Sequence, residues 1–99
     1  MLKRQRQEKI GVSLTLEGQG DKIKFDITFN NLRSSEIEAM AKNEELDIMD
    51  IALAMIAEWD AEYPLTKEGL KELEDDRPGS VKGLIEGFHE ARKVQRVKN

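Results

Sequence analysis

The sequence predicts an α+β fold that is mostly helical, with an N-terminal β-hairpin packed on a central apolar helix and three further short helices. Two observations carry this prediction. Residues 10–29 contain two runs in which apolar and polar residues alternate, as in strands with one buried face. Residues 46–59 read LDIMDIALAMIAEW, and on a helix their large apolar side chains cover an arc of about 200°. A surface helix needs an apolar stripe little wider than ~100°, so this helix must be covered on two sides.

Composition limits the chain to one small domain. It has 99 residues, of which 38% are hydrophobic and 36% are charged, so a small core lies under a heavily charged surface. The absence of cysteine excludes disulfides, thiolate catalysis and thiolate metal sites, and it fits a reducing cytoplasm. The N-terminus lacks the apolar segment of a signal peptide, and no apolar run is long enough to span a membrane.

The charges are unevenly distributed along the chain. Residues 1–35 carry seven bases and four acids, residues 36–76 carry three bases and fourteen acids, and residues 77–99 carry six bases and two acids. An acidic middle argues against nucleic-acid binding by the body of the domain, which would need a broad basic face. Opposite charges at the middle and the ends allow head-to-tail attraction between copies. The alternative is that they form only a solvated surface.

The N-terminal third is predicted to form an arm followed by a hairpin. Residues 1–9 are polar and mostly basic, so we expect a mobile arm. Residues 10–16 and 23–29 each place four apolar side chains on one face, and the sequence GQGD between them supplies the glycines of a tight reversal. Because a hairpin alone is marginally stable in water, we expect its apolar face to cover one side of the central helix.

Helix-capping residues predict where the first helices begin. Ser35 and Glu38 have the spacing of a capping box, which predicts a short helix over 35–42. Asn43 is the predicted cap of the central helix, because two acidic residues follow it and favour a helix N-terminus. We expect the central helix to continue to about Glu62.

Two prolines divide the rest of the helical region, which we expect to span 35–91. Pro64 ends the central helix, since the residue before a proline avoids the helical conformation. Thr66 is the predicted cap of the next short helix. Pro78 suits the first turn of the last helix, and beyond its apolar stripe residues 92–99 form a basic tail.

No group of residues predicts catalysis. Acid–base chemistry requires carboxyl groups whose pKa values are separated by burial and neighbours, but Asp47 with Asp50 and Asp75 with Asp76 fall at helix ends or on exposed stripes, where capping or solvation explains them. His89 is the only histidine and has no thiol to activate and no second histidine to share a metal. The sequence therefore predicts a protein that is not an enzyme and binds neither a cofactor nor a metal.

Four uncharged residues are candidates for protein contacts. Gly83 and Gly87 lie four apart on the last helix, opposite its apolar stripe, and two helical glycines are tolerable if they let another backbone approach closely. They could serve a contact between copies or be neutral surface residues. Trp59 and Tyr63 are core candidates first, and they become anchors for a partner if they are exposed.

The second half of the chain resembles the tail assembly chaperones of long-tailed, siphophage-type bacteriophages. Those proteins tend to have an apolar helix that ends in tryptophan, a Pro-Leu-Thr-x-Glu-x-Leu phrase, a Pro-Gly break and a last helix that ends in basic residues. Here these elements are Ile51 to Trp59; Pro64, Leu65, Thr66, Glu68 and Leu70; Pro78 and Gly79; and Leu84 to Asn99.

The resemblance implies a role in phage morphogenesis. It implies that the protein acts in the host cytoplasm, binds the tape measure protein and keeps it soluble until tail tube subunits polymerise around it, and is absent from the mature virion. It also implies a homo-oligomer and a frameshift-extended form that recruits tail tube protein. We expect contacts between copies to involve four bases, Arg92, Lys93, Arg96 and Lys98.

Two other functions fit the composition. One is a small acidic adaptor or regulator that binds one folded protein and does not oligomerise. The other is a minor structural protein that stays in the virion. A DNA-binding repressor is disfavoured, because only the two basic termini could contact phosphates and such binding is lost at moderate salt.

Overall fold

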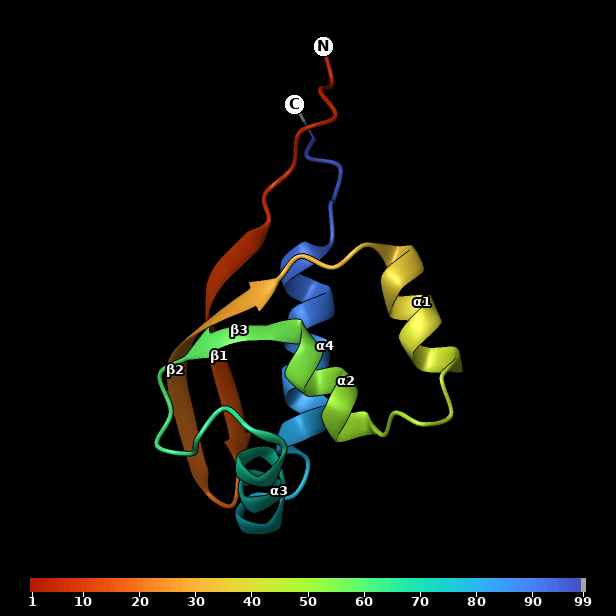
Figure 1. The fold of residues 1–99 in the computed structure, drawn as a ribbon. Coiled ribbons are helices and arrows are strands. Elements are labelled where there is room, and N and C mark those ends of the chain that lie inside the picture. Colours follow the sequence, from red (N-terminus) through yellow and green to blue (C-terminus); the bar gives the residue numbers. More distant parts are fainter. Residues whose placement is uncertain (99) are drawn as a thin grey trace.

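The computed structural model describes residues 1–98. A hairpin is followed by helices, and a short strand after the second helix completes a three-stranded antiparallel sheet in the order β1-β2-β3 (Figure 1). Helices hold 41% of the residues and strands 24%, which confirms the predicted α+β, mostly helical fold. The elements are β1 (Lys9–Gly18), β2 (Asp21–Asn30), α1 (Ser34–Lys42), α2 (Ile48–Met55), β3 (Ile56–Trp59), α3 (Lys67–Asp76) and α4 (Ser80–Arg92).

The predicted hairpin is confirmed, and it is paired along its whole length. The register runs from Lys9 opposite Asn30 to Gly18 opposite Asp21. The two turn residues between them, Gln19 and Gly20, have φ values of 55° and 77°, the left-handed geometry that matches the twist of paired strands. The Gln19 side chain donates a hydrogen bond of 3.1 Å to the last carbonyl of α3, that of Asp76, so the turn is held against α3.

The prediction that the central helix continues to Glu62 was wrong. The helix α2 ends at Met55, and the next four residues form β3, which pairs with β2 so that Ile56 lies opposite Phe29 and Trp59 opposite Ile27. Short apolar runs have the same appearance in a buried helix and a buried strand. The wide apolar arc therefore reflects two elements in succession, and the open hydrogen-bonding edge of β2 selects the strand.

The first helix begins one residue earlier than predicted. The backbone N–H of Arg33 donates to the Glu36 carboxylate at 3.0 Å, so Glu36 makes the hydrogen bond that was predicted for Glu38 with Ser35. The helix α1 has no buried residue and stands apart from the other helices (Figure 1).

The predicted cap of the central helix was also misplaced. Asn43 ends α1 with a backbone hydrogen bond to Met40, and its side chain accepts from the N–H of Glu45 at 3.0 Å. The turn formed there delays the next helix by four residues, and Asp47 caps α2.

The last helix begins after Pro78 instead of including it. Gly79, with φ of 96°, is the residue before α4. A carboxylate from α3 supplies the cap, because Glu74 accepts the backbone N–H groups of Gly79 at 2.8 Å and Val81 at 3.0 Å. This contact joins the two helices across their short connection.

The core lies between one face of the sheet and the helices. β2 is the central strand, and its Ile27 and Phe29 are fully buried. The Phe29 ring meets that of Phe88 in α4 edge to face, with centroids 5.7 Å apart, a favoured arrangement for aromatic pairs. Leu70 of α3 and Leu84 of α4 complete the most buried group. The hairpin therefore packs on α4 as well as on α2.

Both terminal segments extend from the same end of the molecule (Figure 1). Residues 1–8 precede the sheet, and one asparagine holds them: Asn31 donates to the carbonyl of Gln7 and accepts from Arg6, both at 2.8 Å. Residues 93–98 follow α4 and are exposed. The mobility of the arm stays a prediction.

Gly69 provides a stability test of the turn that leads into α3. The Thr66 hydroxyl accepts the N–H of Gly69 at 3.0 Å, which confirms the predicted cap, and a Cβ at Gly69 would lie 1.8 Å from the backbone oxygen of Pro64. We expect Gly69→Ala to lower the free energy of unfolding by about 2–3 kcal/mol, measured by urea unfolding. The control Gly18→Ala meets open space and should change it by less than about 0.5 kcal/mol. Equal effects would contradict the packing described.

Candidate interaction surfaces

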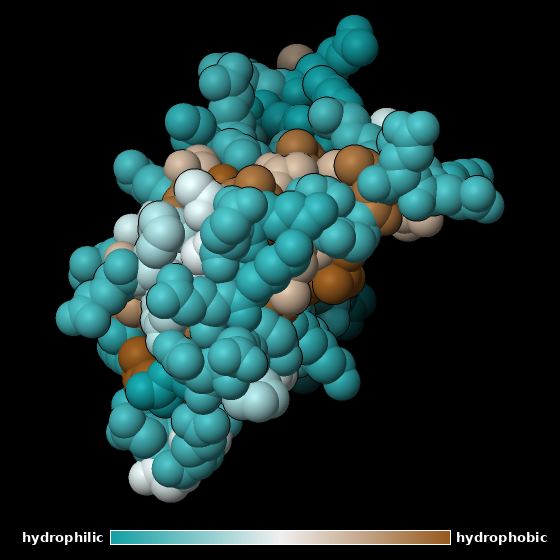
Figure 2. Space-filling model, turned by 60° about the horizontal axis from the view of Figure 1, so that its bottom comes forward, coloured by the Kyte–Doolittle hydropathy of each residue, from teal (hydrophilic) through white to brown (hydrophobic). Residues whose placement is uncertain are grey.

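Apolar and charged side chains gather at several places on the surface of residues 1–98. Within residues 1–98, no group of three or more His, Cys, Asp or Glu side chains could hold a metal ion. No helix in this part of the chain is long and apolar enough to cross a bilayer. On the face drawn in Figure 2 the surface is mostly hydrophilic, and hydrophobic atoms show in small areas between polar side chains.

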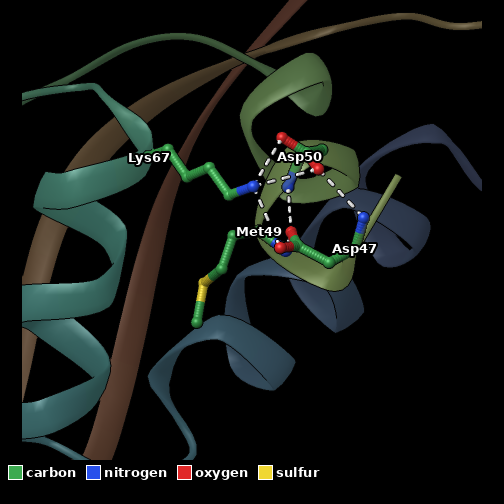
Figure 3. A network of polar contacts seen from close by, with 4 residues as sticks. All are labelled: Asp47, Met49, Asp50 and Lys67. Atoms are coloured by element: carbon green, nitrogen blue, oxygen red, sulfur yellow. Dashed lines mark hydrogen bonds and ion pairs between the residues drawn. The ribbon is translucent and has the colours of Figure 1, made fainter. Parts of the chain in front are cut away.

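Asp47 and Asp50 form a capping box at the start of α2 (Figure 3). One oxygen of Asp47 accepts the N–H groups of Met49 at 2.9 Å and Asp50 at 3.0 Å, and Asp50 accepts the N–H of Asp47 at 2.9 Å. Either solvation or capping was expected for this pair, and the structure shows capping, so both carboxylates have a structural use.

Lys67 joins this capping box to the beginning of α3. Its ammonium nitrogen lies 3.0 Å from Asp47 Oδ2 and 3.2 Å from Asp50 Oδ1 (Figure 3). The hydrogen bond from Lys67, with the backbone N–H groups, lowers the pKa of Asp47 from 3.8 to about 2. The same contacts raise the pKa of Lys67. Such mutual stabilisation of opposite charges fixes the two helix starts relative to each other.

Trp59 and Tyr63, predicted as core residues or partner anchors, are half-buried. The indole N–H donates to the carbonyl of Tyr63 at 3.0 Å, and the Tyr63 hydroxyl donates to Asp76 at 2.6 Å. Donation to the Asp76 carboxylate raises the pKa of Tyr63. Both polar groups are thus used inside the chain, while the rings line an open recess with Phe25 and Leu73. Contact with a partner there stays a prediction.

Gly83 and Gly87 face the hairpin. A Cβ at Gly83 would lie 2.8 Å from a methyl carbon of Leu16, and one at Gly87 would lie 2.7 Å from a methyl carbon of Leu14. The glycines were expected to admit another backbone, but here they admit leucine side chains from a strand of the same chain. Their part in a contact between copies stays a prediction, and a groove remains beside them along β1.

A second apolar groove lies between the N-terminal ends of α2 and α4, with a volume of about 600 Å³. It is lined by Ile48, Met49, Val81 and Ile85, and Ile48 is 53% exposed. The sequence predicted that the apolar arc of the central helix would be covered on two sides, but Ile48 at the start of α2 remains largely exposed, while Val81 is buried in the core.

Arg92 is the last residue of α4 and does not belong to the tail, contrary to the predicted boundary. Its guanidinium lies 3.5 Å from the side-chain oxygens of Asn31 and Ser34 and 5.9 Å from the centroid of the Phe88 ring. Because it is half-buried in these contacts, it stabilises the fold where α4 ends. Lys93, the first tail residue, is exposed.

The fold separates the charges into two ends. The arm and the tail, which project together (Figure 1), carry seven bases and one acid over residues 1–9 and 93–98. At the opposite end lies α3, with five acids and two bases over Lys67–Asp76. The molecule therefore has a basic end and an acidic end, which the sequence indicated only as segments.

The family model described as phage tail assembly chaperone matches residues 7–99, nearly the whole chain. This chain belongs to that family. The resemblance seen in the second half is thereby confirmed, and the match also includes the hairpin. No curated protein and no solved structure matches the chain.

Lys67→Met tests the charge network between α2 and α3. Asp47 has a lowered pKa in the folded protein, so its contribution to stability is present above about pH 4 and is lost as the pH falls through about 2. The variant keeps the cap but lacks the cation. We expect its deficit in the free energy of unfolding, measured by urea unfolding, to be largest near neutral pH and to shrink between about pH 4 and pH 2.

The matched control is Lys71→Met, which removes an exposed lysine of α3 that makes no ion pair within the described residues. It should follow the pH profile of the wild type. If the deficit of Lys67→Met were constant over this range, the network would not hold the pKa of Asp47 low.

Proposed function

We propose that this phage tail assembly chaperone binds the tape measure protein as a homo-oligomer and keeps it soluble until tail tube subunits polymerise around it. The observation that carries the proposal is the family match over residues 7–99. An assembly chaperone acts by binding and release, so the function requires no catalytic group. Action in the host cytoplasm and absence from the mature virion belong to the same proposal.

The charge distribution supports self-association. A copy with a basic end and an acidic end can attract the opposite end of another copy, and such attraction speeds encounter and fixes orientation more than it adds affinity. Contact between unlike ends is heterologous, so it can repeat from one copy to the next. Repeated copies would suit a partner as long as a tape measure protein.

The small number of exposed apolar side chains also fits reversible binding. Apolar side chains are exposed in short stretches, such as Ile48 and the two tail valines Val94 and Val97. Small apolar contacts that combine with charges give weak, exchangeable binding, which a chaperone needs because the tube must replace it. A frameshift-extended form could add a contact to tail tube protein without changing this domain.

Co-expression with the tape measure protein encoded nearby tests the proposed binding. We expect pull-down of the tape measure protein to recover a soluble complex with several copies of this chain, and we expect the tape measure protein alone to be largely insoluble. Sizing chromatography and mass spectrometry of the complex measure the stoichiometry. A chain that stays monomeric at all concentrations and does not bind would instead support the adaptor function.

Charge reversal at the tail tests the electrostatic part of self-association. The variant Lys93→Glu, Arg96→Glu and Lys98→Glu leaves Arg92, and hence the fold contacts of α4, unchanged. We expect the dissociation constant between copies, measured by sedimentation at low salt, to rise at least about tenfold. A variant with the same change in net charge at Lys22, Lys24 and Lys71, which are exposed outside both termini, is the control. Equal weakening by the two variants would contradict a specific role of the tail.

A further inference from the structure

The outer edge of β1 has no strand beside it. In the sheet order β1-β2-β3, β1 is an edge strand of ten residues. The carbonyl of Asp26 in β2 accepts a hydrogen bond from the N–H of Asp60, on the β3 side, at 2.9 Å. The backbone N–H and C=O groups of the alternate β2 residues Ile27 and Phe29 therefore point toward β1. Given the register and the alternation of antiparallel pairing, five β1 residues point their backbone N–H and C=O groups outward. They are Lys9, Gly11, Ser13, Thr15 and Glu17.

A groove runs along this unpaired edge. It is lined by five consecutive β1 residues, 12–16, and by the face of α4 that carries Gly83 and Gly87. Because Gly83 and Gly87 have no side chains, they leave room for Leu14 and Leu16, which form the apolar floor of the groove. The charged residues of the lining are both acidic, Glu86 and Glu90.

An added strand would satisfy the free backbone groups and place alternate side chains in the groove, the arrangement by which sheet edges bind peptides. The apolar floor fits an aliphatic side chain, and the two glutamates fit lysine or arginine. Pairing β1 with β1 of another copy would bring equal sets of acids together, which is unfavourable. The groove therefore selects a short extended segment that is both aliphatic and basic.

The C-terminal tail of the chain has this composition. Residues 93–98 read KVQRVK and are not part of any helix or strand. Val94 and Val97 are 93% and 79% exposed. In an extended segment successive side chains alternate between two faces, so each face of the tail presents one valine and at least one base. Either face matches the apolar floor and the acids of the groove.

The tail cannot readily reach the groove of its own chain. Gly83 lies against Leu16 and Gly87 against Leu14, so α4 and β1 run in opposite directions, and the tail leaves where β1 begins. It projects away from the sheet (Figure 1). To return, it would need a reversal of at least two residues, which leaves four of residues 93–98 for pairing. A second copy can present the whole tail.

We propose that the tail of one copy, residues 93–98, adds as a strand to the β1 edge of another copy and places a valine and its bases in the groove beside α4. This inference rests on the proposed self-association and names the two surfaces that carry it. The contact joins unlike surfaces, so each copy keeps one free tail or one free edge for the next.

Amide hydrogen exchange on the full chain tests the pairing, with an internal control. The N–H groups of Val12, Leu14 and Leu16 bond to β2 in every copy, whereas those of Gly11, Ser13, Thr15 and Glu17 are free in an isolated copy. We expect the members of the second set that line the groove, Ser13 and Thr15, to exchange at least about tenfold more slowly at a concentration where the chain assembles than at one where it is monomeric. Unchanged exchange of these two N–H groups in the assembled chain would overturn the proposal.

Two substitutions at Thr15 test whether the outer edge of β1 is used in assembly. Thr15→Pro removes one outward N–H without removing a bond to β2, and Thr15→Ala removes the same side chain but keeps the N–H. Sedimentation should show weakened assembly, by about tenfold or more, for the proline variant alone, with circular dichroism confirming that both variants fold. If both assemble like the wild type, the edge is not used and the inference fails, while binding to the tape measure protein can still be recovered by pull-down.

A variant of the tail tests whether the tail is the strand that is added to β1. In the variant Val94→Asp and Val97→Asp, the slowed exchange of the outward β1 amides should disappear together with assembly. If these amides were still protected in the assembled variant, a different segment would occupy the edge, and the tail would be excluded as the partner.

Discussion

The contact between Phe29 and Phe88 is the packing interaction on which the arrangement of the other elements depends. Phe29 lies in the central strand β2, between β1 and β3, and Phe88 lies in α4, and both rings are fully buried. Their edge-to-face packing fixes α4 across the face of the hairpin. With α4 in this position, its glycines meet the leucines of β1 and Arg92 reaches Asn31 beside the N-terminal arm. A core with few large side chains thus positions both termini and the groove along β1.

Several polar contacts around this core are helix caps, and two of them connect neighbouring helices. Lys67 links the start of α3 to the capping box of α2, and Glu74 of α3 caps α4. Asp47 and Asp50, one of the two carboxylate pairs that could have suggested catalysis, are used in this way. The remaining charges are separated into a basic end and an acidic end. For a member of a tail assembly chaperone family, a surface that sorts charge in this way is suited to repeated, reversible contacts.

The sequence predicted those elements whose signal is local. The hairpin was predictable because alternation and a Gly-Gln-Gly turn are short-range patterns. The cap at Thr66 was confirmed, whereas the caps predicted at Ser35 and Asn43 were misplaced, because capping patterns fit several neighbouring residues. The strand β3 was not predictable, because Ile56 and Trp59 fit a helix as well as a strand. Only their pairing with β2 distinguishes the two. The close contact of Gly87 with Leu14 joins residues far apart in the chain, so the spacing of the glycines indicated a close approach but not the strand that makes it.

The most direct test of the proposed function is the protein content of two fractions from infected cells, obtained by quantitative mass spectrometry. One fraction is the tape measure protein captured before the tail tube polymerises, and the other is purified particles. We expect several copies of this chain for each tape measure chain in the first fraction and none in the second. A fixed number of copies in the particles, or none with the captured tape measure protein, would contradict the proposed function.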